Sequence, residues 1–189
     1  MLPPELQSLI DQIDACERSA VQVVDGLNDE DVNWVPPAST GVSKWSIAQC
    51  LNHLTLMNEF YLRGWMDALT EAASRRVGPF TSLRPTPFGR WFARSMEPPV
   101  RMKLKANQVA TPAARFPRAG LVEAYAASHD TYRRVVSAAG TVDVNRIVRP
   151  NAFIPSVKMR LATVLLIIPA HDRRHLWQAG NVRRARQGV

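Results

Sequence analysis

The sequence predicts an all-α protein, a four-helix bundle with a long crossover between its second and third helices. Four long segments place apolar residues three and four positions apart, which is the spacing of one helix face. Between the second and third segments, residues 76–117 hold several prolines, so no long helix persists through them. Four amphipathic helices with one long connection are typical of a four-helix bundle. We expect one domain over residues 1–189.

The first helix is predicted over residues 4–27, and residues 28–42 are predicted to form a loop because they are rich in Asn, Asp, Pro, Ser and Gly. The second helix begins at Ser46, which is followed three positions later by Gln49. An S-x-x-Q sequence forms a reciprocal capping box at a helix start. The apolar period continues from there to about residue 75, which predicts one continuous helix.

The crossover at 76–117 contains two distinctive segments. FGRWFARSM at 88–96 is predicted as a short helix, and VRMKLKA at 100–106 is basic with interleaved apolar residues. We expect a solvated connection packed by Phe88, Trp91 and Phe92. The alternative is a phosphate-binding or membrane-surface role for the basic segment.

The third helix is predicted over residues 118–139, with Gly140 as its stop. The fourth is predicted over 160–184 and has Pro169 inside it, where we expect a kink or a loosened turn. The apolar period is the same on both sides of this proline. Its inner face is marked by Val164, Ile168, Ala179 and Val182.

Composition excludes several classes of protein. With 46% hydrophobic and 21% charged residues the chain is in the globular range. The acidic start does not resemble a signal peptide, and Cys16 and Cys50 form no CxxC pair, so we expect a cytoplasmic protein with reduced cysteines. The longest apolar stretch, 164–170, falls well short of the roughly 20 residues that span a bilayer. We expect no membrane partner.

The net charge of +8 raises the question of an anionic partner. Nucleic-acid binding requires a localised basic face or a recognisable module, whereas the basic residues here are spread over several segments. We therefore expect no nucleic acid.

A candidate metal site begins with His171 and His175. At about 100° per residue the two lie roughly 40° apart around the helix and one turn apart along it. Both belong to the inner face of the fourth helix. An H-x-x-x-H pair of this kind holds a single metal ion in helical zinc sites.

His53 supplies a third ligand from the flank of the second helix's apolar stripe. Taken alone, it is better interpreted as a core histidine bonded to a backbone carbonyl. Three of only four histidines face inward on two long helices, however, and this predicts that His53, His171 and His175 bind one divalent ion.

Other residues near this site have open interpretations. His129 lies on the apolar face of the third helix, where a structural role is favoured over one in orienting a ligand or substrate. Gln178, one turn beyond His175, either orients a ligand or a bound water, or bonds to solvent at the helix end. Cys50 is a rival ligand, although its central place in the stripe favours packing. Asp172 is expected to be solvated or paired with an arginine.

Two segments, WSIAQCLNHL at 45–54 and HDRRHLWQ at 171–178, resemble the DinB-like family of four-helix-bundle proteins, and FGRWFARSMEPPVRMKLKA resembles its crossover. The resemblance implies that His53 on the second helix joins His171 and His175 on the last helix as a metal-binding triad. It also implies nickel, zinc or a similar ion, a homodimer, and an activity among thiol-dependent transferases and isomerases.

The leading functional hypothesis is a metal-dependent enzyme that transfers a low-molecular-weight thiol to a small electrophilic substrate. Three neutral imidazoles leave positions on a metal open, and a bound ion lowers the pKa of a thiol or water. A hydrolase is the near alternative, although no Glu stands beside the histidines as in H-E-x-x-H. A non-catalytic, stress-related metal-binding bundle is the alternative from another class.

Overall fold

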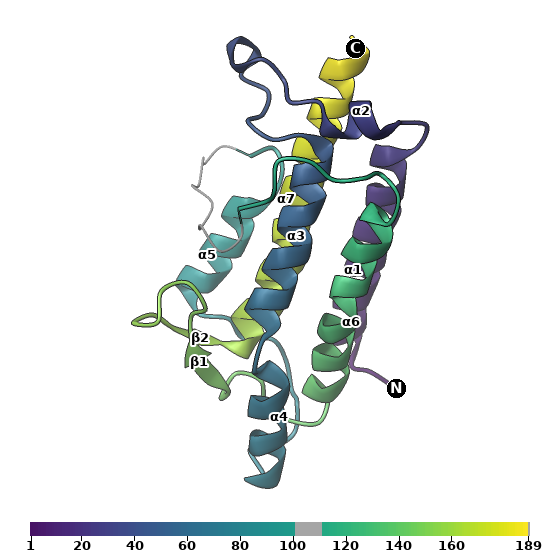
Figure 1. Ribbon diagram of the computed structural model, residues 1–189. Coiled ribbons are helices and arrows are strands. Elements are labelled where there is room, and N and C mark those ends of the chain that lie inside the picture. The colour runs from purple at the N-terminus through teal and green to yellow at the C-terminus, as the bar shows by residue number, and fades with distance from the viewer. Residues whose placement is uncertain (101–110, 189) are drawn as a thin grey trace.

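The computed structural model describes residues 1–100 and 111–188 and consists mainly of helices, which confirms the all-α prediction (Figure 1). Four long helices form the bundle. In this bundle α1 and α3 each contact both α6 and α7, so α1 lies diagonally opposite α3, and α6 opposite α7. These four helices are α1 (Pro4–Val24), α3 (Ile47–Leu62), α6 (Leu121–Ala139) and α7 (Leu161–Gln187).

The helix directions explain the crossover. In Figure 1, α1 and α7 run upwards, whereas α3 and α6 both run downwards. The chain must therefore return along the length of the bundle between α3 and α6. It does so through α5 (Pro87–Met96), which packs against α7 and confirms the predicted short helix. Most of the basic segment at 100–106 lies outside the described residues.

Close packing of α5 on α7 depends on Gly89. A Cβ atom at this position would lie 2.5 Å from Cγ2 of Thr163 on α7. Glycine is therefore the residue that lets the two helices approach so closely. Phe92 packs into this contact, but Phe88 and Trp91 are 67% and 54% exposed, so the expectation that all three pack the connection was wrong for these two.

The predicted continuous second helix was also wrong. It breaks after Leu62 at Gly64, which has a φ of 76°, and resumes as α4 (Trp65–Ser74). This left-handed conformation suits glycine, and a Cβ there would lie 2.7 Å from Nη2 of Arg149. The helix start was predicted correctly, since Ser46 Oγ accepts a hydrogen bond from the Gln49 N–H while Gln49 Oε1 accepts one from the Ser46 N–H.

Short elements appear where a loop or no structure was predicted. The loop at 28–42 contains α2 (Asp29–Asn33), which Asn28 caps, and a 3-10 helix, η1 (Ala38–Thr40). Before α7, strands β1 (Val148–Pro150) and β2 (Lys158–Arg160) form an antiparallel hairpin. Strands of this length carry no readable alternation, which is why the sequence did not predict them.

The ends of the long helices differ from the predictions by a few residues. α1 stops three residues earlier than predicted, before Gly26 at positive φ, and α6 starts three residues later, after Gly120 at positive φ. α7 extends to Gln187 and runs through the buried Pro169 without interruption. No helix among the described residues is both long and apolar enough to cross a membrane.

Candidate metal centre

The structure brings His53, His171 and His175 together between α3 and α7. The coordinating nitrogen atoms of the three lie within 4.8 Å of one another. Their side chains come from two facing helices and are nearly buried, with exposures of 3%, 9% and 8%. The described residues contain no other group of His, Cys, Asp and Glu side chains with this geometry.

The three imidazole rings form a triangle. The ring centroids of His53 and His175 are 4.6 Å apart, those of His171 and His175 also 4.6 Å, and those of His53 and His171 5.2 Å. One ion at the centre of such a triangle can reach a nitrogen of each ring. The turn that contains Pro169 therefore leaves His171 in place to share a ligand with His175.

Burial makes the histidines of α7 suitable metal ligands. Desolvation, followed by the charges of the neighbouring histidines and of Arg174, lowers the pKa of His171 well below its ordinary value of 6.5. Burial, then His53 and Arg174, lowers the pKa of His175 to about 3. Both imidazoles are neutral at pH 7, and a metal ion binds neutral imidazole.

Gln178 determines which nitrogen of His175 faces the cluster. Ser43 Oγ donates to the Trp45 carbonyl, so it can only accept from Gln178, whose Nε2 lies 2.8 Å away. The amide oxygen of Gln178 must then face His175 Nδ1, at 2.9 Å, and this nitrogen donates its proton to it. His175 Nε2 is left as the nitrogen with a free lone pair.

Trp45 covers one side of the cluster. Its ring centroid lies 4.7 Å from that of His53 and 5.6 Å from that of His175, on which it stacks. Trp45 is the first residue of the segment 45–54 that carries the family resemblance, but no role at the metal site was predicted for it. Ser43 lies between the predicted loop at 28–42 and the predicted helix start at Ser46, and no role was predicted for it. Both residues lie close to the start of the histidine-bearing helix α3, and Trp45 shares the segment 45–54 with His53; these are the signals that could have pointed to them.

His129 lies outside the cluster, in a buried network of its own. Its Nδ1 lies 2.8 Å from Glu17 Oε1 and its Nε2 lies 2.7 Å from Asp172 Oδ2, to which the Tyr125 hydroxyl also donates. Burial alone would lower the pKa of His129, but the hydrogen bonds and charges of Asp172 and Glu17 raise it. These contacts link α1, α6 and α7.

The expectation that Asp172 is solvated or paired with an arginine was wrong, because its side chain is fully buried and bonded to His129 and Tyr125. Cys50 is also fully buried but lies outside the histidine cluster, and burial raises the pKa of its thiol. Arg174 was missed by the sequence reasoning. It is buried beside the cluster, and its charge contributes to the low pKa of His171 and His175.

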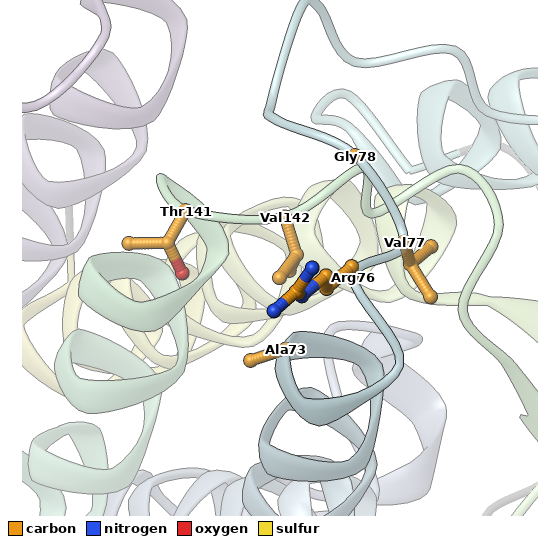
Figure 2. A pocket seen from close by; sticks show the side chains of 6 residues that line it. All are labelled: Ala73, Arg76, Val77, Gly78, Thr141 and Val142. Atoms are coloured by element: carbon orange, nitrogen blue, oxygen red, sulfur yellow. The ribbon is translucent and has the colours of Figure 1, made fainter.

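A pocket of about 290 Å³ lies elsewhere, where the end of α4 meets the turn after α6 (Figure 2). Arg76 reaches across it towards Val142 and Thr141. Its lining contains no His, Cys, Asp or Glu side chain. This pocket therefore takes no part in the candidate metal centre.

Comparison with known protein families gives one match. The family model described as the DinB superfamily matches residues 12–179, a range that includes all three histidines of the cluster. Comparison with curated proteins and with solved structures gave no match.

Proposed function

The chain belongs to the DinB superfamily, and from this premise we propose that it is a metal-dependent enzyme that transfers a low-molecular-weight thiol to a small electrophilic substrate. The observation that supports this most is the buried triangle of His53, His171 and His175. Among the described residues, no further His, Cys, Asp or Glu side chain joins these three. A metal held by three imidazoles keeps at least one position for a substrate, unlike a four-ligand structural site.

The residues present fit a divalent ion. Two of the three imidazoles have pKa values lowered by burial, and the Gln178 amide holds the His175 proton on the nitrogen that would not bind the metal. When bound, a divalent ion supplies Lewis-acid chemistry that makes a thiol or a water molecule a nucleophile at neutral pH. Nickel or zinc is the ion we expect, because imidazole suits both.

The chain's own residues have distinct roles in this proposal. Ser43 and Gln178 orient His175, and Trp45 shields the cluster from water on one side. The positive charge of Arg174 beside the cluster favours an anionic ligand such as a thiolate. In the reaction the thiol sulfur bonds to the electrophilic carbon, the leaving group departs with its bonding electrons, and the thiol proton passes to solvent.

Hydrolysis is the weaker candidate. It requires a base that takes a proton from water, and Asp172 is the carboxylate next to the cluster in sequence. Both His129 and Tyr125 contact Asp172 Oδ2, and its side chain is buried.

The non-catalytic alternative requires a closed ligand shell, and neither Cys50 nor His129 belongs to the histidine cluster.

Cobalt substitution tests the proposal. Cobalt at three histidines with an open position should develop sulfur-to-metal charge-transfer absorption when a low-molecular-weight thiol is added. A spectrum that does not respond to any thiol would indicate a closed structural site instead. A screen of thiols with electrophilic acceptors then identifies the substrates. Homodimer formation stays a prediction, which sedimentation velocity measures.

A further inference from the structure

A second pocket lies away from the histidine cluster, where the end of α3 meets the β1–β2 hairpin and the start of α7. Its volume is about 340 Å³, within the range of small-molecule sites. Phe60 of its wall follows His53 by seven residues, and Val164 precedes His171 by seven. At about 1.5 Å per residue, two helical turns or roughly 10 Å separate the pocket from the cluster. The two sites are therefore distinct.

One wall of this pocket is aromatic. Phe60, Tyr61 and Trp65 line it, and Phe153 of the hairpin loop stacks on Phe60 with 4.9 Å between ring centroids. The hairpin loop is held by Asn151, whose Oδ1 accepts hydrogen bonds from the N–H groups of two following residues. The aromatic wall is thus built from α3 and α4, with Phe153 of the hairpin loop packed against it, and it offers an apolar surface to a flat ligand.

The charged side chains that line the pocket are both positive. Arg63 and Arg149 contribute guanidinium groups, and the lining contains no Asp or Glu. In the described part of the chain neither arginine forms an ion pair with a carboxylate. The Arg149 guanidinium lies close to the Gly64 backbone, since a Cβ at Gly64 would be 2.7 Å from Nη2 of Arg149.

We propose that this pocket binds a small aromatic anion. The flat body lies against the wall of Phe60 and Tyr61, and a carboxylate or phosphate group binds the guanidinium groups of Arg63 and Arg149. Arginine suits both anions because its planar fork donates two parallel hydrogen bonds. The break between α3 and α4 at Gly64 then has a function, since it makes room for the arginine that recognises the anion.

Calorimetric titration of metal-free protein in chelator tests this proposal, because without the metal the probes cannot coordinate an ion at the histidine cluster. The probes are 2-naphthoate, 2-naphthyl phosphate and the neutral 2-naphthylmethanol. At least one anion should bind about 10-fold or more tightly than the alcohol, as expected for charge-assisted hydrogen bonds. The stronger of the two anions identifies the preferred headgroup. Equal affinity for all three probes, or no binding at millimolar concentration, would overturn the proposal.

Variants locate the binding site. Arg149→Met should weaken anion binding about 10-fold or more and leave the alcohol unchanged. Arg63→Met should weaken anion binding several-fold. Because Arg63 is exposed, this variant provides a second test if Arg149→Met folds poorly. Arg146→Met is the matched control, since Arg146 is exposed nearby and does not line the pocket. Unchanged anion affinity in both pocket variants would overturn the assignment.

Discussion

The Gln178 side chain accepts a hydrogen bond from Nδ1 of His175 at 2.9 Å, and its own amide donates to Ser43 at 2.8 Å. These two hydrogen bonds keep the proton of His175 on Nδ1 in the metal-free protein. A metal site that is oriented in this way loses less entropy on binding than one whose rings turn freely. The role of Gln178 as an orienting group can be measured directly.

Gln178→Ala should weaken metal binding about 10-fold to 100-fold, as is typical when a partner of a ligating histidine is removed. Competition against a fluorescent zinc chelator measures the affinity. Gln22→Ala is the control, because Gln22 is exposed on α1, and α1 contributes no residue to the histidine cluster. If Gln178→Ala binds zinc as tightly as this control, Gln178 does not orient the ligand.

Cys50 should contribute packing and no metal ligation. It lies outside the histidine cluster and its thiol pKa is raised by burial, while burial and nearby charges, Asp172 foremost, raise the pKa of Cys16 to about 12. Cys50→Ala should keep full metal content and lose about 1 kcal/mol of unfolding free energy. Both native thiols should resist a thiol reagent until urea is added. Loss of metal in Cys50→Ala would make Cys50 a ligand.

The His129 network predicts a pH dependence of stability. Because Asp172 and Glu17 raise the pKa of His129 above its unfolded value of about 6.5, its stabilising contribution is complete below that pH. It is lost as the pH rises through the folded pKa. Urea unfolding should therefore show the largest difference between wild type and His129→Gln near pH 6, and a smaller one at alkaline pH.

An NMR titration of the His129 ring gives an independent measurement, with a midpoint expected above 6.5. The groups that face this ring are Glu17 from α1, Asp172 from α7 and Tyr125 from its own helix. A stability difference that grows with pH, or a midpoint below 6.5, would contradict a charged His129.

The contact between α5 and α7 predicts a coupled pair of substitutions. Gly89→Ala should cost about 1–3 kcal/mol, because the new methyl group collides with Thr163. Thr163→Ala removes both colliding atoms and a buried hydroxyl that has no hydrogen-bond partner among the described residues, so the double variant should recover most of the loss. Urea unfolding measures all of these free energies.

The control for this pair is Gly180→Ala within α7. A Cβ at Gly180 would contact only Arg184, at 3.8 Å, so the substitution should stabilise the helix by about 0.5–1 kcal/mol. Purely additive effects of Gly89→Ala and Thr163→Ala would show that the two side chains do not collide.

The apolar periods allowed the bundle helices and the inward direction of three histidines to be predicted from sequence. The i, i+4 spacing alone placed His171 and His175 on one face, and the position of His53 on the flank of an apolar stripe placed it opposite them. These are local properties of a regular helix. Local patterns therefore accounted for most of the candidate site.

Features that depend on distant partners were not predictable. From the sequence alone, Asp172 is expected to be a surface charge. Its burial follows from contact with His129, which lies 43 residues away in sequence. From the sequence alone, Gly64 is a glycine that a helix can tolerate. The reason for a glycine there follows only from Arg149, whose guanidinium lies against it. Ser43 belongs to a segment with no period, and its role follows only from the position of Gln178 on the last helix.

Elemental analysis of protein purified without a histidine tag measures whether His53, His171 and His175 hold one divalent ion. Wild type and His129→Gln should both contain about one metal ion per chain, and His171→Ala should contain almost none. Circular dichroism confirms that each variant is folded. Full metal content in folded His171→Ala, or its loss in folded His129→Gln alone, would contradict the assignment of the metal to this cluster.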